Sequence, residues 1–185
     1  MNTQNGKLCS SLHNKLFNLR KVNKYTNFET RLKFLNAHIM GNINYLLPLY
    51  KGCNIDLIAK IHKVIICAAK TAIGNPCFKK SNAFMLNKCK WLPINKLIDC
   101  AVLNLIHKII INKTPSVIYN YYKIPNRAVV DITTKYIPKQ VKTEKFYIYS
   151  GIKMYNKISV DIKNSKNFKG KLKIHISGVI PDTND

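Results

Sequence analysis

The chain has 185 residues, which is enough for one ordinary domain or for a small domain with an appendage. Its hydrophobic share of 46% is normal for a globular protein and argues against wholesale disorder. Its charge is far from balanced, since 31 Lys and Arg residues outnumber 8 Asp and Glu and leave a formal net charge of +23. Such an excess attracts polyanions, most simply the phosphates of RNA or DNA.

The type of basic residue leaves a second explanation open. The chain has 28 Lys but only 3 Arg, together with 25 Ile and 22 Asn. Lys, Ile and Asn are encoded by A/T-rich codons, so a drifting gene can reach this composition without selection for binding. Lys also lacks the bidentate fork of Arg, and any nucleic-acid binding should therefore be weakly selective for sequence.

The cysteines, the N-terminal residues and the apolar runs bear on whether the chain binds metal, is secreted or spans a membrane. No Cys-x-x-Cys pair occurs, and Cys100 and His107 are separated by about 10.5 Å of helical rise, too far to share one zinc ion. We therefore expect no metal, no cofactor and reduced, mostly buried thiols. Residues 1–10 are polar, and no apolar run approaches the ~20 residues of a membrane span. These features predict an intracellular protein, cytoplasmic or nuclear and not secreted, with no membrane partner.

The first half of the chain is predicted to be helical. Residues 1–27 form a polar, basic N-terminal segment with only a weak helical pattern. From Phe28 apolar residues recur at helical spacing as far as Pro48, and Asn54 is placed to cap the next helix. That helix carries one apolar stripe and ends at Gly74 in the C′ position.

Three lysines, Lys60, Lys63 and Lys70, fall on the side of this helix opposite the apolar stripe. Two interpretations remain open for them. They either form an ordinary solvated helix face or track the phosphates of a nucleic acid.

A short helix from Ser81 to about Lys90 leads into Trp91-Leu92-Pro93, with Pro93 at the first position of the most regular helix in the chain. The wide apolar stripe over residues 94–110 predicts a helix at the centre of a bundle, with Ile98, Ala101 and Leu105 almost fully buried. We expect residues 28–113 to form one helical bundle.

The composition and the apolar pattern of the sequence change after residue 113. Residues 114–150 are basic and rich in Tyr and turn signals, which predicts a partly extended connector with one hairpin. Tyrosines among lysines are compatible with base stacking, but the sequence favours the other interpretation, in which they form the edge of a modest core. Residues 151–177 should form a small C-terminal helical unit, followed by a frayed tail at 178–185. The predicted fold class is mainly α.

The order of these segments resembles the C-terminal, thumb and post-thumb region of Jockey-like reverse transcriptases from LINE-type (non-long-terminal-repeat) retrotransposons. The similarity covers about residues 12–175 in collinear order, and each motif alone is weak. Five segments carry it: RLKFLNAHIMGNINYLLPLY (31–50), IHKVIICAAKTAIG (61–74), KWLPINKLI (90–98), LIHKIIINKTPSVI (105–118) and FYIYSGIKMYNKISVDIK with FKGKLK (146–173).

Several positions depart from the family pattern. Tyr50 replaces a Trp, Leu97 an Arg and Ser159 a Pro, while Tyr155-Asn156 stands for a Trp-Asn pair. In the helix over 61–74, Ala68, Ala69 and Gly74 match, Lys70 stands for an Arg and His62 for a Gln. The losses favour relaxed selection, and the unbroken apolar stripes favour a chain that still folds.

The resemblance implies a region that grips a template–primer duplex, without supplying chemistry. Two-metal nucleotidyl transfer needs clustered carboxylates, and this sequence has no Asp-Asp or Asp-x-Asp. We therefore expect a non-catalytic fragment with sequence-independent affinity for RNA or DNA phosphates. The alternatives are a domesticated or decaying remnant that contacts proteins, or a subunit completing a polymerase palm encoded elsewhere.

The candidate residues follow from this interpretation. The predicted nucleic-acid contacts are Lys60, Lys63, Lys70, Arg31 and Arg127, and no residue is predicted to be catalytic or to bind metal. The predicted structural core consists of Leu57, Ile61, Ile65, Ala68, Trp91, Pro93, Ile98, Ala101, Leu105 and Ile109.

Overall fold

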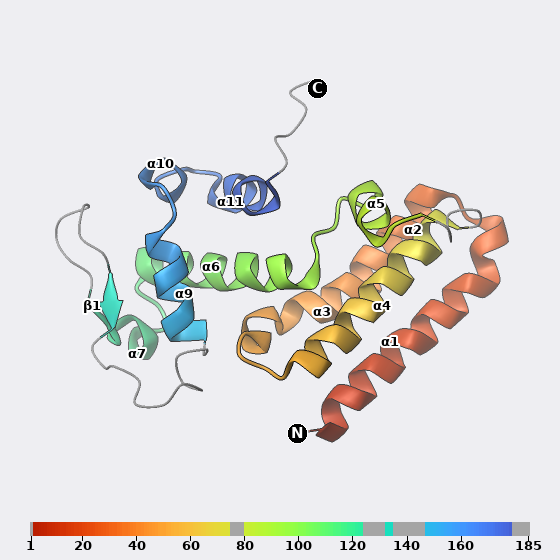
Figure 1. The fold of residues 1–185 in the computed structure, drawn as a ribbon, viewed down its shortest axis with the longest axis horizontal. Helices are drawn as coiled ribbons and strands as arrows, with labels where there is room; N and C mark the ends of the chain where they lie inside the picture. Colours follow the sequence, from red (N-terminus) through yellow and green to blue (C-terminus); the bar gives the residue numbers. More distant parts are fainter. Residues whose placement is uncertain (1, 75–79, 124–131, 135–146, 179–185) are drawn as a thin grey trace. The chain divides into compact units, whose positions relative to one another are not determined.

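The structure, a computed structural model, describes residues 2–74, 80–123, 132–134 and 147–178. The described residues are mostly helical, with one pair of two-residue strands, so the predicted mainly α fold is confirmed (Figure 1). The chain divides into two compact units. Unit 1 comprises residues 1–46 and 53–95, and unit 2 comprises residues 47–52 and 96–185.

Unit 1 is built on two long helices that lie side by side, α1 (Asn2–Val22) and α4 (Ile55–Ile73) (Figure 1). They run in the same direction, because residues 9–14 lie beside residues 60–63 and Arg20 reaches Thr71. The other elements of unit 1 are η1 (Asn23–Tyr25), α2 (Phe28–Leu35), the π-helical η2 (Asn36–Met40), α3 (Gly41–Tyr45) and α5 (Asn82–Lys88).

Three polar caps fix where the helices of unit 1 begin. The Asn27 side chain accepts from the Thr30 amide, Asn54 from the Asp56 amide and Ser81 from the Phe84 amide. Each cap satisfies an amide that would otherwise lack a partner in the first turn. The predicted cap at Asn54 and the glycine at the end of α4 are both found, with Gly74 at φ 77°.

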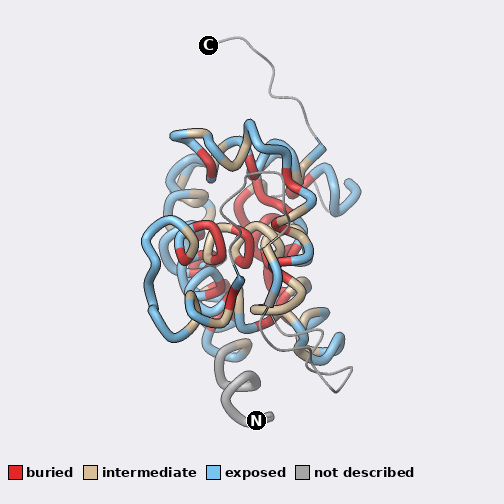
Figure 2. The backbone as a smooth tube through the Cα atoms, turned by 90° about the vertical axis from the view of Figure 1, so that its left-hand side faces the viewer, coloured by how far each residue is buried: buried red, intermediate tan, exposed pale blue. Residues whose placement is uncertain are grey.

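The N-terminal segment is more ordered than its polar composition suggested. Leu12, Leu16 and Leu19 are buried, and α1 makes extensive contact with α4. Figure 2 shows the buried residues in red along the inner sides of the helices. The weak apolar pattern predicted less helix than α1 contains. Three leucines on one side are enough to anchor this helix, because the long apolar helix α4 lies beside them.

Unit 2 contains the segment 47–52 and most of α6 (Ile94–Asn112). Its other elements are η3 (Leu47–Tyr50), α7 (Ser116–Tyr119), β1 (Tyr122–Lys123), β2 (Thr133–Thr134), α9 (Tyr147–Asn156), α10 (Val160–Lys163) and α11 (Phe168–Ser177). The two strands pair antiparallel. This division differs from the boundaries expected from the sequence, which assigned residues 28–113 to a single bundle.

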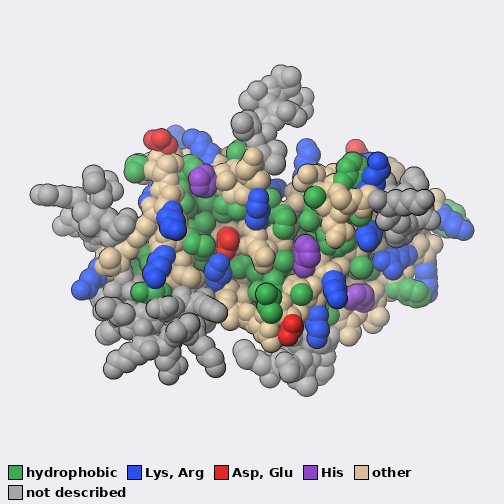
Figure 3. Space-filling model, in the orientation of Figure 1, with side chains coloured by type: hydrophobic (Ala, Val, Ile, Leu, Met, Phe, Trp, Pro, Cys, Tyr) green, Lys and Arg blue, Asp and Glu red, His purple; other side chains and the backbone are tan. Residues whose placement is uncertain are grey.

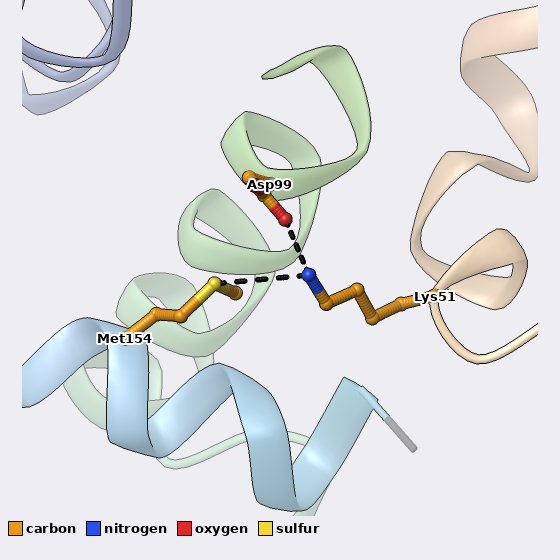
Figure 4. Close-up of polar contacts among 3 residues, drawn as sticks. All are labelled: Lys51, Asp99 and Met154. Atoms are coloured by element: carbon orange, nitrogen blue, oxygen red, sulfur yellow. Dashed lines mark hydrogen bonds and ion pairs between the residues drawn. The ribbon is translucent and has the colours of Figure 1, made fainter. Parts of the chain in front are cut away.

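An ion pair holds the segment 47–52 within unit 2. Lys51 Nζ lies 2.6 Å from Asp99 Oδ1 on α6 and 3.8 Å from the sulfur of Met154 on α9 (Figure 4). Both side chains of the ion pair are partly shielded from water, at 26% and 33% exposure. The segment therefore joins residues that lie about fifty and about a hundred positions further along the chain.

The predicted core is correct in part. Ile61, Ile65, Ala68, Trp91, Ile98 and Ile109 are buried. Ala101 and Leu105, predicted to be almost fully buried, are only partly buried, as is Leu57, and Pro93 is exposed.

The packing of α9 explains why Ala101 and Leu105 are not the centre of the buried side of α6. The most buried side of this helix is centred on Val102 and Ile106, and the backbone of Gly151 on α9 lies directly against both. The packing of α9 therefore decides which part of a wide apolar stripe becomes the core. Pro93 precedes the first residue of α6 and contributes its restricted backbone instead of a buried surface.

A buried histidine lies inside unit 2. His107 Nδ1 is hydrogen-bonded to the Tyr155 hydroxyl at 3.0 Å, and its ring stacks on Phe168 with centroids 3.6 Å apart. Burial lowers the pKa of His107 below its usual value of 6.5 and raises the pKa of Tyr155 to about 12. Lys163 Nζ lies 5.1 Å from the centroid of the Tyr155 ring.

Stability should therefore fall on mild acidification. The unfolded chain binds a proton at His107 near pH 6.5, whereas the folded chain resists it. The stabilisation is complete above pH 6.5 and is lost as the pH falls below that value. We expect His107→Gln to have a flatter dependence of unfolding free energy on pH between 7.5 and 5.5 than the unsubstituted protein, measured by urea denaturation. Parallel curves would contradict a protonation cost at His107.

Candidate functional site

An open groove with a cavity volume of about 470 Å³ lies between α1 and α4 in unit 1. Its α4 side presents Lys60 and Lys63, both exposed. Its α1 side presents short polar side chains and a thiol from Cys9, Ser10, His13 and Asn14. The groove thus combines two cations with hydrogen-bonding groups, and none of the described residues that line it is a carboxylate.

Helix geometry explains why α4 places its lysines here. The side of α4 with Ile61, Ile65 and Ala68 is buried, so residues on the other side remain near solvent. Lys63 and Lys70 are seven residues apart, which is about two turns, and they lie on the same side with a rise of about 10.5 Å between them. Lys70 is partly buried and stands further along α4 than the residues that line the groove.

The ends of the two helices are held together beyond the groove. Arg20 Nε donates to the Thr71 hydroxyl at 3.2 Å, and the Asn23 side-chain Nδ2 donates to the Thr71 carbonyl at 3.3 Å. The Thr71 hydroxyl in turn donates to the Cys67 carbonyl. These contacts fix α1 against α4, so the two walls of the groove keep a defined spacing.

His13 is oriented by its own helix. Its Nδ1 lies 2.8 Å from the Cys9 carbonyl oxygen, an acceptor, so Nδ1 carries the hydrogen. The remaining nitrogen, Nε2, accepts a hydrogen bond when the ring is neutral and donates one when it is protonated. Every side chain of the groove other than the Cys9 thiol can therefore contact a phosphate oxygen, directly or through water.

The other predicted contacts do not meet at this groove. Arg31 lies at the C-terminal end of α4, where its guanidinium approaches Gly74 and its Nε donates to the Asn27 carbonyl. A cation at a helix C-terminus is stabilising, which gives Arg31 a structural role. Arg127 and most of the tyrosine-rich connector lie outside the described residues.

Four groove residues were missed by the sequence-based prediction: Cys9, Ser10, His13 and Asn14. The signal was present, because Leu12, Leu16 and Leu19 already mark α1 as amphipathic. An amphipathic helix also has flanks, and the flank next to α4 becomes a wall of the groove. Only the pairing of α1 with α4 could identify which flank that is.

The cysteines differ in part from expectation. Of the five that the structure describes, only Cys89 is buried, and the other four are partly exposed. Burial raises the pKa of Cys89 and of Cys100 to about 11, so both remain protonated and weakly nucleophilic near neutral pH. Within the described ranges, no three His, Cys, Asp or Glu side chains gather closely enough to hold a metal ion.

Positive charge is distributed widely over the described surface. Figure 3 shows many Lys and Arg side chains and few carboxylates on the face that it presents. The groove is thus one local arrangement within a generally basic protein. No helix of the described chain is both long enough and apolar enough to cross a membrane.

Comparison with known proteins adds no relative to this description. No protein-family model, curated protein or solved structure matches the chain.

Proposed function

We propose that this protein binds nucleic acid through phosphates, without sequence preference and without catalysis, and that the lysine side of α4 with the α1–α4 groove is its contact surface. The observation that carries the proposal is the groove itself, where two exposed lysines lie among hydrogen-bonding side chains and none of the described lining residues is a carboxylate. The net charge of +23 supplies long-range attraction to any polyanion. The resemblance to the C-terminal region of LINE-type reverse transcriptases agrees with this role.

The salt dependence of binding tests the proposal. Each lysine that neutralises a phosphate releases a counterion and adds about 0.9 to the slope of log affinity against log salt on duplex DNA. Replacing Lys60, Lys63 and Lys70 together by Gln should lower that slope by about 2–3 units. The measurement is fluorescence anisotropy on one duplex at several salt concentrations, with helicity checked by circular dichroism.

A matched variant separates a site from diffuse attraction. Lys33, Lys80 and Lys88 are exposed lysines of unit 1 outside the groove, and their replacement by Gln removes the same charge. This triple variant should lose much less slope. Equal losses in the two triple variants would mean that binding has no site, and the proposal would fail. Lysines of the N-terminal segment are unsuitable controls, because α1 is itself a wall of the groove.

Sequence independence is the second half of the test. Lysines on phosphates contact no base edges, so duplexes of different sequence should bind with similar affinity and lose similar slope. Affinity that differs strongly between duplexes of equal length would argue for direct base contacts instead.

A further inference from the structure

An exposed aromatic side chain stands next to the groove. Phe17 follows His13 by four residues and Asn14 by three, so it is their neighbour on the surface of α1. Its side chain is 58% exposed, although contact between the apolar ring and water costs free energy. Lys21 Nζ lies 4.6 Å from the centroid of its ring.

The position of Phe17 along the helix pair matters for binding. His13 lies beside Lys63, and Arg20 bonds to Thr71, so Phe17 is level with the turn of α4 between Lys63 and Lys70. Along the axis of the helix pair, Phe17 is therefore level with a point between two lysine positions that are about 10.5 Å apart on α4.

This combination matches the chemistry of single-stranded nucleic-acid binding. Such sites pair a cationic groove that follows the backbone with aromatic side chains on which bases stack. A duplex keeps its bases stacked inside, so it can offer phosphates to the lysines but no base to Phe17. A single strand can offer both.

We propose that the α1–α4 groove prefers single-stranded over duplex nucleic acid, with phosphates on Lys60, Lys63 and Lys70 and one base stacked on Phe17. The inference rests on the proposed function and names its substrate class. Base stacking tolerates any base, so the preference agrees with binding that is independent of sequence.

The test uses the full chain and four probes of twelve nucleotides: oligo-dT, oligo-rU, an abasic strand with the same phosphates, and a duplex. Phe17→Leu keeps an apolar side chain but removes the flat ring. It should weaken binding to oligo-dT and oligo-rU about five- to tenfold, the low end of what one stacked base contributes. Binding to the abasic strand and to the duplex should change less than twofold, and Phe17→Tyr should retain the affinity for oligo-dT.

Phe84 provides the matched control. It is an exposed phenylalanine of unit 1, 42% exposed, with Lys80 Nζ 5.5 Å from its ring centroid, and it lies on α5 outside the groove. Phe84→Leu should leave binding to all four probes unchanged. A loss as large as that of Phe17→Leu would assign stacking to exposed aromatics in general and overturn the inference.

The remaining outcomes separate the inference from the proposed function. An equal loss on the abasic strand, or no loss on either oligo-dT or oligo-rU, would overturn the role of Phe17 while the lysine variants still report on the phosphate site. The ratio of affinities for oligo-rU and oligo-dT assigns RNA or DNA as the preferred strand, and a stacking loss on either supports the inference. If the lysine triple variants lose equal slope, the proposed function itself fails.

Discussion

Ile106→Ala should lower the unfolding free energy by about 2–5 kcal/mol, the range for removing a large aliphatic side chain from a packed interior. Ile106 is fully buried in α6, where the α9 backbone at Gly151 lies against it. The alanine leaves a cavity that the rigid backbone of two helices cannot close. Chemical denaturation followed by circular dichroism measures the loss.

The neighbouring residue is the control for this prediction. Leu105→Ala removes a side chain of equal size from the same helix, and both substitutions create the same helix former. Because Leu105 is only partly buried, its loss should be at least about 1 kcal/mol smaller than that of Ile106. The reverse order would mean that α6 packs on the side centred on Leu105.

Gly151→Ala should destabilise the protein by about 1–3 kcal/mol, although alanine is the better helix former. A Cβ at Gly151 would lie 2.3 Å from Ile106 Cδ1 and 2.6 Å from Val102 Cγ1. Ile106 can move the end of its side chain, whereas the Val102 methyl group is bonded directly to Cβ. The helices must therefore separate, which disrupts the core of unit 2. Thermal and urea denaturation both measure the change.

Gly41→Ala is the counterpart to this substitution. Gly41 has helical backbone angles, φ −56° and ψ −48°, and beyond its own helical turn the one described atom within 4 Å of a Cβ there is the Asn36 carbonyl oxygen at 3.6 Å. Alanine should therefore stabilise the protein by about 0.5–1 kcal/mol through helix propensity. Stabilisation by both substitutions would show that α9 does not lie against α6 as closely as described.

Local signals in the sequence were sufficient for the bounds of α4 and for the start of α5, although they underestimated α1. Asn54 and Gly74 bound α4, and Ser81 starts α5, where capping chemistry predicts it. Helical periodicity and caps depend on residues within a few positions of one another, so a single sequence contains them. The position of the α4 lysines opposite the apolar stripe was likewise predicted from spacing alone, because a helix fixes which residues share a side.

Long-range contacts decided the rest. The pairing of α1 with α4 created the groove and placed His13 and Phe17 beside it. The approach of α9 selected the Val102 and Ile106 side of α6 over the side with Leu105. The ion pair between Lys51 and Asp99 holds residues 47–52 in unit 2, whereas the residues directly before and after this segment belong to unit 1. A helix that is apolar over much of its circumference can pack in several ways, and only the tertiary contacts of the folded chain select one of them.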